Sequence, residues 1–176
     1  LRADRLVPVN GKIKKIAEEI TQDKSDALQR VRAIYDYIID ELTYSKDDPK
    51  VCGIGDSLLT LQYKKGICTD YHSLFISLVR SLGIPAKFEI GFRIPQEPRE
   101  GKLNGYHCWA KFYIKGKGWI PVDISEADKN PEKRDYYFGN IDENRIRLTT
   151  GRDIILKEAR DLKSLNFFVY PYAELN

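Results

Sequence analysis

The chain has 176 residues, of which 42% are hydrophobic and 31% charged, and its formal net charge is +3. This weak charge is scattered along the sequence, which argues against nucleic acid as a partner, and no run of about 18 apolar residues could span a membrane. The length suffices for one hydrophobic core, so we expect residues 1–176 to form a single domain.

Three cysteines, Cys52, Cys68 and Cys108, limit the metal and redox chemistry of the chain. They form no C-x-x-C pair and no Cys/His cluster at zinc spacing, so we expect no metal and no other cofactor. The odd number leaves at least one free thiol. A disulfide between Cys52 and Cys108 remains an open alternative.

The first residues bear on localisation. The sequence contains no Met and begins Leu1-Arg2-Ala3-Asp4-Arg5, which lacks the apolar core of a signal peptide. Either a leader has been removed or the chain is a fragment. A removed leader would place the protein outside the cytoplasm, so we expect an extracytoplasmic protein, periplasmic or secreted.

The first half of the chain is predicted to be helical. Apolar residues at helical spacing predict helices over 13–20, 25–39, 56–62 and 68–82. Ser25 is the expected N-cap of the second helix. The fourth helix is expected to end at Gly83-Ile84-Pro85, because Gly just past a helix with Pro shortly after it is a strong stop signal.

The second half of the chain changes to the period of strands. Alternating apolar residues predict strands over 86–94, 106–114, 119–123, 145–149 and 166–172. A hairpin turn is expected at 115–118 and a polar connection at 125–134. The polar loop 95–104 is interpreted as a solvated connection, with a substrate-contacting rim as the alternative. Helices followed by strands indicate an α+β fold with a mainly antiparallel sheet.

Cys68 opens an apolar helix directly after Lys65-Gly66-Ile67. A thiol attacks acyl carbons as a thiolate, and the free group has a pKa of about 8.5. The helix N-terminus favours the thiolate by roughly 0.3–1 kcal/mol, which is less than one pKa unit at about 1.4 kcal/mol per unit. Its position alone therefore does not activate Cys68, and a base is required.

The two histidines are the candidates for that base. His72 lies on the same predicted helix, one turn after Cys68, where side chains diverge from the helix axis. His107 lies in a strand that could pack against the start of this helix and present its imidazole to the sulfur. We therefore predict that His107 is the base and that His72 is structural or faces the substrate.

Asp123 is the candidate acid that orients the imidazole. A hairpin turn centred near Gly116 makes residues 107 and 123 approximate cross-strand neighbours, so Asp123 could fix the tautomer of His107 and stabilise its charged form. Side chains alternate along a strand, so Trp109 shares the face of His107 and could either line the site, facing the substrate, or simply fill the core. Cys108 should point to the opposite face, into the core.

Each of these three residues also has a purely structural interpretation. A lone cysteine such as Cys68 on an apolar helix is usually a buried small hydrophobe. A single strand histidine such as His107 is more often structural, and an aspartate after Pro-Val, such as Asp123, often caps a turn. Their combination in this order favours a Cys-His-Asp thiol enzyme over three unrelated structural residues.

Four segments together resemble the transglutaminase-like superfamily, and its bacterial members are the most similar. These segments are Gly66-x-Cys68-x-Asp70-Tyr71, Arg80-Ser81-Leu82-Gly83-Ile84-Pro85, His107-Cys108-Trp109-Ala110 and Gly118-Trp119-Ile120-Pro121-Val122-Asp123. The resemblance, over about 56–124, implies a papain-like core with N-terminal helices packed on a mainly antiparallel sheet. It also implies that Cys68 is the nucleophile, His107 the base and acid, and Asp123 the orienting residue.

The chain departs from this family pattern near the expected oxyanion site. No Trp precedes Cys68, whereas in animal transglutaminases such a Trp helps stabilise the oxyanion. The donors are therefore expected from the Cys68 backbone and from Gln62 or Tyr63. Cys108 stands where the family more often has Ala. The zinc-binding cysteine pairs of the related peptide:N-glycanases are missing, which disfavours that activity.

The sequence therefore predicts thiol-dependent acyl transfer on peptide or carboxamide bonds through a Cys68 thioester. Hydrolysis is favoured over transfer to an amine, because bacterial members of the superfamily include many proteases. The expected partner is a peptide or protein substrate. One rival is a non-catalytic binding module that retains the fold. The other is a recognition domain for carbohydrate or peptide that uses Tyr136-Tyr137-Phe138 and Phe167-Phe168.

Overall fold

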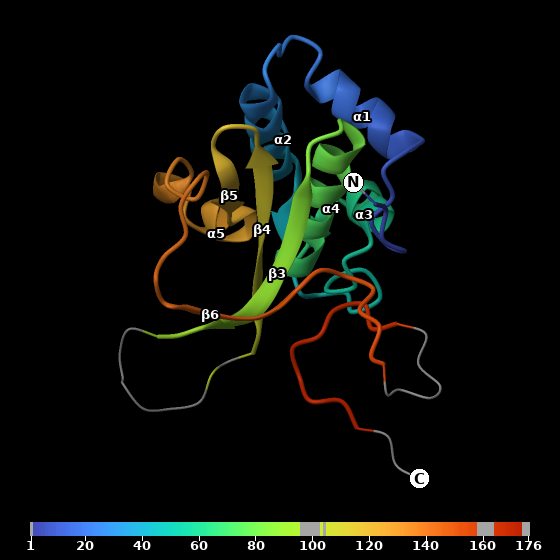
Figure 1. Cartoon of the computed structure of the whole chain (residues 1–176), viewed down its shortest axis with the longest axis vertical. Coiled ribbons are helices and arrows are strands. Elements are labelled where there is room, and N and C mark those ends of the chain that lie inside the picture. The colour runs from blue at the N-terminus through green and yellow to red at the C-terminus, as the bar shows by residue number, and fades with distance from the viewer. Residues whose placement is uncertain (1, 96–102, 104, 158–163, 174–176) are drawn as a thin grey trace.

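Helices occupy the first half of the chain and an antiparallel sheet the second half, as the computed structural model in Figure 1 shows. It describes residues 2–95, 103, 105–157 and 164–173. Helix α4 (Cys68–Ser81) lies between the sheet and the helices α1, α2 and α3. This arrangement of N-terminal helices on an antiparallel sheet confirms the predicted α+β class.

The first two helices pack one apolar face each against α4. They are α1 (Lys12–Ile20) and α2 (Ala27–Glu41). The N-cap of α2 is Asp26, whose carboxylate accepts hydrogen bonds from the backbone N–H groups of Leu28 and Gln29 at 2.9 and 3.0 Å. The predicted cap, Ser25, is therefore one residue too early.

A short parallel pair of strands fixes the chain just before α4. Helix α3 (Ser57–Tyr63) begins after the Asp56 cap, and strand β2 (Lys65–Gly66) then pairs with β1 (Thr43–Tyr44). This pairing ties the end of α2 to the approach to Cys68. The start of α4 is thus held by backbone hydrogen bonds as well as by side-chain packing.

Helix α4 is the central element of the core. Every residue from Cys68 to Val79 is buried, because the sheet covers one side of the helix and other helices pack around the rest. The helix ends where predicted: Gly83 takes φ 80°, a conformation that glycine adopts without strain, and its N–H donates to the Arg80 carbonyl. The N-terminus of α4 is the lower end of that helix in Figure 1.

The sheet has four antiparallel strands in the order β5-β4-β3-β6. The strands are β3 (Ala86–Arg93), β4 (His107–Ile114), β5 (Gly118–Val122) and β6 (Arg145–Thr150). At Gly91 the neighbouring strand comes so close that a Cβ would lie 1.8 Å from the Ile146 carbonyl oxygen. His107 and Arg147 both pair with Gly91, so the first residues of β4 and β6 meet at the same end of the sheet.

Two segments differ from the predictions. The polar connection predicted at 125–134 contains α5 (Ile124–Lys129) and the 3-10 helix η1 (Pro131–Lys133), because Ile124 and Ala127 give this polar stretch a buried face. The strand predicted over 166–172 was wrong, since the pairing there is a single bridge between Ile154 and Leu165. Most of the loop predicted at 95–104 lies outside the described residues.

One core joins the helices to the sheet. Its buried residues run from Val7 before α1 to Val169 near the end of the described chain. Tyr137 is buried in it, and Phe138 packs on Tyr35 and Phe112, so these aromatic residues serve packing. Within the part of the chain that the structure describes, the helices are too short or too polar to cross a membrane.

Candidate active site

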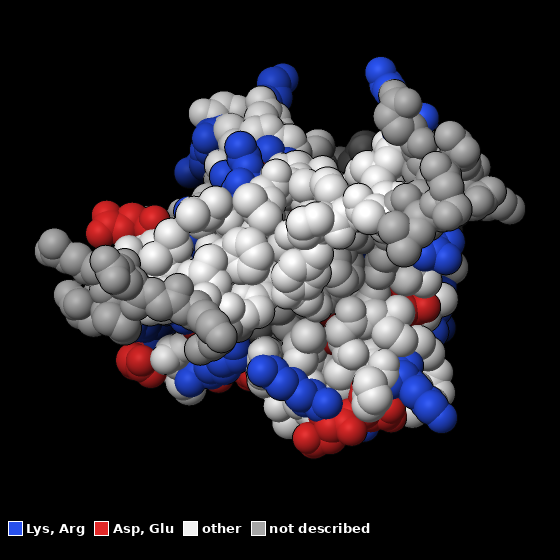
Figure 2. Space-filling model, turned by 90° about the horizontal axis from the view of Figure 1, so that it is seen from below, with Lys and Arg blue, Asp and Glu red and all other residues white. Residues whose placement is uncertain are grey.

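Cys68 is the first residue of α4 and is 4% exposed. An amide at this position has no acceptor within its own helix, so the Cys68 N–H and the helix dipole both point toward the region of the sulfur. Figure 2 views the molecule from the end where α4 begins, and uncharged side chains fill most of the centre of that face. The helix that carries the thiol therefore begins toward a face with few charged side chains at its centre.

Asp70 fixes the loop that precedes α3 against the start of α4. Its buried carboxylate accepts hydrogen bonds from the N–H groups of Gly53 at 2.6 Å, Gly55 at 2.8 Å and Ile67 at 2.8 Å. Gly66 packs directly on this side chain, since a Cβ there would lie 2.5 Å from the Asp70 Cβ. Asp70 is therefore a structural residue that joins this loop to the start of α4.

Replacing Asp70 with Ala is expected to lower the free energy of unfolding by about 3–5 kcal/mol, because three backbone donors lose a buried charged acceptor. Asp26→Ala is the matched control, since the Asp26 carboxylate also accepts backbone N–H groups but is exposed. We expect that control to cost about 1 kcal/mol. Urea denaturation measures both values, and equal losses would contradict this role of Asp70.

His107 and Asp123 are in direct contact. The Nε2 atom of His107 lies 2.6 Å from Oδ2 of Asp123, which leaves Nδ1 as the ring nitrogen available to the thiol. The imidazole is also near enough to the Cys68 thiol to lower its pKa. The structure therefore brings Cys68, His107 and Asp123 together in the predicted order.

The route by which Asp123 reaches His107 differs from the prediction. The register of β4 and β5 aligns Ala110 with Val122, so the position opposite Asp123 is that of Trp109. The predicted alignment of residues 107 and 123 was wrong by two positions. Asp123 follows β5 as the N-cap of α5, and from there its side chain reaches diagonally to His107.

The Asp123 carboxylate has further partners that hold it in place. Oδ1 accepts hydrogen bonds from the Ser125 hydroxyl and the Glu126 N–H, both at 3.1 Å. Oδ2 accepts a hydrogen bond from Nη1 of Arg145 at 2.5 Å. Asp123 is thus both a helix cap and the partner of the imidazole, so the structural and functional interpretations of this residue coexist.

Arg145 was missed by the sequence analysis. Its side chain is 3% exposed, and its second terminal nitrogen pairs with Asp142 at 2.7 Å. The guanidinium lies 5.3 Å from the centre of the Trp109 ring. A strand arginine in the sequence has no signature that distinguishes such a buried ion pair from an exposed one.

The charges at the site alternate in sign. The pKa of the Cys68 thiol is held well below its usual range by the Cys108 thiol first and then by His107, against the effect of burial. Burial alone would lower the pKa of His107, but Asp123 and the contact with Cys68 raise it to about 10. Burial would raise the pKa of Asp123, and His107 and Arg145 hold it well below its usual value. The arrangement favours a thiolate beside an imidazolium.

His72 is an internal link rather than a surface residue. Its Nε2 accepts the N–H of Ile124 at 3.0 Å, so Nδ1 carries the proton and donates to the Cys68 carbonyl at 2.7 Å. Burial lowers the pKa of His72, in agreement with this neutral form. His72 is 0% exposed, so its position supports the structural interpretation and not contact with a substrate.

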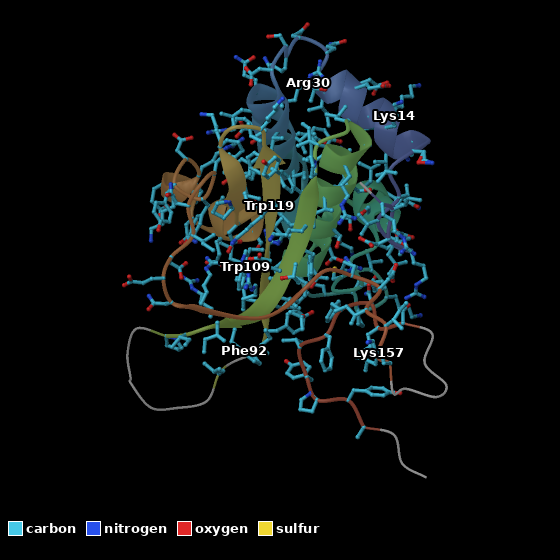
Figure 3. The ribbon with its side chains drawn as sticks, in the orientation of Figure 1. Lys14, Arg30, Phe92, Trp109, Trp119 and Lys157 are labelled. Carbon is cyan, nitrogen blue, oxygen red and sulfur yellow. The ribbon has the colours of Figure 1, made fainter. Side chains whose placement is uncertain are left out.

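Trp109 is also buried, at 2% exposure. Its indole N–H donates to Glu89 at 2.8 Å, and its ring lies 6.3 Å from that of His107. Figure 3 shows Trp109 below Trp119, toward the end of the sheet where β4 begins. Trp109 therefore supports the imidazole and Arg145 from within, a position that gives no support to a substrate-facing role.

The predicted oxyanion donors beyond Cys68 lie at the end of α3. Gln62 and Tyr63 are the last residues of α3, and both side chains are exposed. Strand β2 and Ile67 separate them from Cys68 in the chain. The side chain of Tyr106 lies at the start of α4, since its hydroxyl is 3.3 Å from the hydroxyl of Thr69.

A cavity of about 760 Å³ lies next to Asp142 rather than next to the thiol. None of Cys68, His107 and Asp123 lines it. Arg145 connects the two places, because it bonds both Asp123 and Asp142. The residues around the cavity are Arg93, Ile94, Pro95, Lys133, Tyr136, Tyr137, Asp142 and Asn144.

All three cysteines are free, which excludes the Cys52–Cys108 disulfide in this structure. Cys108 is fully buried on the α4 side of the sheet, as the alternation along β4 predicted. Its thiol is nevertheless near enough to that of Cys68 to shift its pKa. Among the described residues, no group of His, Cys, Asp and Glu could hold a metal ion.

Comparison with known sequences identifies the family. The family model for the transglutaminase-like superfamily matches residues 14–124. An uncharacterized protein of Haemophilus influenzae is 30% identical over 209 residues, which cover 99% of this chain and 56% of that protein. The uncharacterized protein YebA of Bacillus subtilis is 26% identical over 137 residues, which cover 68% of this chain and 18% of YebA.

Solved structures share the fold at low identity. A candidate cysteine protease from Cytophaga hutchinsonii superposes with a TM-score of 0.63 at 22% identity, over 85% of this chain and 45% of that one. The periplasmic domain of TgpA from Pseudomonas aeruginosa, bound to ethylmercury, has a TM-score of 0.53 at 24% identity, over 72% and 48%. The chain thus spans 56% or less of each of these four proteins. Because the family model covers most of its length, the chain belongs to the transglutaminase-like superfamily.

Proposed function

We propose that this protein catalyses thiol-dependent acyl transfer on peptide or carboxamide bonds. The observation that carries the proposal is the chain of contacts from the Cys68 thiol through the His107 imidazole to the Asp123 carboxylate. Three unrelated structural residues have no reason to meet at a helix N-terminus in this order. Cys68 is the proposed nucleophile, His107 the acid and base, and Asp123 the residue that holds the imidazole.

The proposed reaction proceeds through a thioester. The Cys68 thiolate attacks the carbonyl carbon, and His107 donates its Nδ1 proton to the leaving amine as the C–N bond breaks. The Cys68 N–H is one donor to the oxyanion, since it has no acceptor within its helix. Gln62 and Tyr63 stay predictions as the second donor. The acceptor then attacks the thioester, and His107 removes its proton.

Hydrolysis is the proposed main outcome, ahead of transfer to an amine. Water reaches the thioester without a binding site of its own, whereas an amine has to be held at the site and protected from competition with water. The similarity in fold to the candidate cysteine protease from Cytophaga hutchinsonii is consistent with this choice. The proposed substrates are therefore peptides or proteins.

The setting of the protein also remains a proposal. We propose an extracytoplasmic location, because a protein of similar fold is the periplasmic domain of TgpA. We further propose that residues 1–176 form one domain, since a single core takes side chains from Val7 to Val169. A fractionation of the native cells followed by immunodetection tests the first proposal, and cooperative urea unfolding tests the second.

Alkylation by iodoacetamide across pH 4–9 tests the thiolate directly. Cys68 is expected to react at pH values well below the free-thiol pKa of about 8.5, because its pKa is lowered beside Cys108 and His107. In His107→Ala this early reaction should be lost. Cys108 is the internal control, since burial raises its pKa well above the usual value and its thiol is inaccessible.

The same measurement distinguishes the enzyme from a binding module that retains the fold. Peptide mapping assigns each labelled cysteine, and urea-unfolded protein gives the rate of unperturbed thiols. If Cys68 in the folded protein reacts only near the pH of the unfolded chain, the thiolate–imidazolium pair is absent and the binding module becomes the better interpretation.

A further inference from the structure

A second thiol lies against the proposed nucleophile. Cys108 is 0% exposed and Cys68 is 4% exposed, and the two thiols are near enough for each to shift the pKa of the other. The Cys108 sulfur also lies 4.0 Å from the Thr69 hydroxyl and 3.7 Å from Nδ1 of His72. Because that same Nδ1 is 2.7 Å from the Cys68 carbonyl, the contacts of Cys108 place it at the first turn of α4.

The two thiols differ in their surroundings. Cys68 faces the His107 imidazole and the start of the helix, so it favours the thiolate. Cys108 sits in the core behind it, where burial raises the pKa and keeps the group protonated. A peroxide reacts with thiolates far faster than with thiols, so oxidation is directed to Cys68 and leaves Cys108 as an intact thiol beside it.

We propose that Cys68 and Cys108 form an oxidative modification site in which peroxide converts the neighbouring thiols into a reversible disulfide. The Cys68 thiolate attacks the O–O bond of hydrogen peroxide, which yields a sulfenic acid and hydroxide. The Cys108 sulfur then attacks the Cys68 sulfur, the S–OH bond breaks, and water leaves with the Cys108 proton. Overall, two thiols are oxidised and one peroxide is reduced to two waters.

The disulfide would switch off the proposed nucleophile and would also protect Cys68 from irreversible oxidation. It removes the proposed nucleophile, and in this respect the inference rests on the proposed function. It also intercepts the sulfenic acid before further peroxide drives it to the sulfinic and sulfonic acids, which thiol reductants do not reverse. A disulfide requires the two sulfurs to approach to about 2.05 Å. The contacts of Cys108 with Thr69 and His72 already place its sulfur at the first turn of the helix that Cys68 begins.

Tryptic peptide mapping can follow the oxidation of each cysteine separately. Cleavage after Lys and Arg separates the three cysteines into peptides 51–64, 66–80 and 103–111. The folded protein is treated with a several-fold molar excess of hydrogen peroxide, the remaining thiols are alkylated, and the peptides are identified by mass. A second aliquot is treated with dithiothreitol before alkylation, which measures how much free Cys68 returns.

The expected result is a linked 66–80/103–111 pair, lighter than the two thiol peptides by two hydrogens, and a return of Cys68 to the thiol with reductant. Cys108→Ala and Cys108→Ser should show no linked pair and should accumulate sulfinic and sulfonic Cys68 that reductant does not restore. Cys52→Ala should behave as the unaltered protein. Far-UV circular dichroism checks that each variant is folded.

Three outcomes would overturn the inference. They are an unmodified Cys68 after peroxide treatment, overoxidation of Cys68 at the same rate with and without Cys108, and a link from Cys68 to Cys52 instead. This readout does not use enzymatic activity. A disulfide in a protein that lacks acyl-transfer activity would therefore defeat the proposed function and leave the oxidative site standing.

Discussion

Cys68→Ala is expected to lower kcat/KM by about 10⁴-fold or more, because without a sulfur no thioester forms and both halves of the reaction are lost. Peptide release from an unfolded protein substrate measures hydrolysis, and coupling of a fluorescent primary amine to the same substrate measures amine transfer. Both signals should disappear together, since both acceptors draw on one thioester. Their ratio in the unaltered protein shows which acceptor the site prefers.

The fold should survive this substitution. Cys68 lies at the first position of α4, where Ala is tolerated, and removing a buried thiolate also removes its desolvation cost. Cys52→Ala is the matched control, because it deletes a buried thiol outside the contact chain. We expect both variants to unfold cooperatively. Full activity in a folded Cys68→Ala protein would eliminate the thioester and with it the proposed mechanism.

The sequence pattern predicted Cys68, His107 and Asp123 because each one lies near a recognisable helix start or turn. Cys68 comes two residues after Gly66 and begins an apolar period, and the turn 115–118 fixes the strands on either side of it. The hairpin was sufficient to bring His107 and Asp123 close, but not to define their register. Pairing follows the turn that the backbone adopts, and here Tyr113 aligns with Trp119. A shift of two residues keeps the side chains on the same face, so the contact survived the error.

The contacts that the sequence did not predict all depend on long-range packing. Arg145 reaches Asp123 only because β6 pairs with the far edge of β3 at the end of the sheet where β4 begins. The helix α5 was missed because its polar composition conceals a buried face that exists only against α2 and α4. The Cys68–Cys108 contact needs the position of α4 on the sheet. No local period encodes any of these placements.

Arg145 makes the Asp123 carboxylate unusual among groups that orient an imidazole, because two cations share one carboxylate oxygen. Oδ2 of Asp123 lies 2.6 Å from the His107 ring and 2.5 Å from the Arg145 guanidinium. A carboxylate with one oxygen shared by two cations is held rigidly, and it stays ionised at any ordinary pH. Its contribution to catalysis should therefore be orientation of the imidazole together with support for its charge.

Asp123→Asn is expected to lower kcat by about 10³–10⁴-fold with the fold retained, since Asn also caps helices well but offers no charge to His107. The pKa of His107, about 10 in the intact site, should fall toward the ordinary histidine value of about 6.5. His107 acts as an acid, so the alkaline limb of the kcat/KM profile should move to lower pH.

Arg145→Met tests whether the charge of Arg145 supports the pKa of His107 or whether Arg145 contributes only to stability. It removes a cation beside Asp123, so the carboxylate interacts with His107 alone and the pKa of His107 should not fall. The variant is expected to lose stability, because Asp142 loses its buried partner, while its alkaline limb stays near that of the unaltered protein. If Asp123→Asn left the alkaline limb in place, or if both substitutions moved it equally to lower pH, Asp123 would not be supporting the imidazolium. Its contact with His107 would then be structural, the interpretation that its role as the N-cap of α5 already offers.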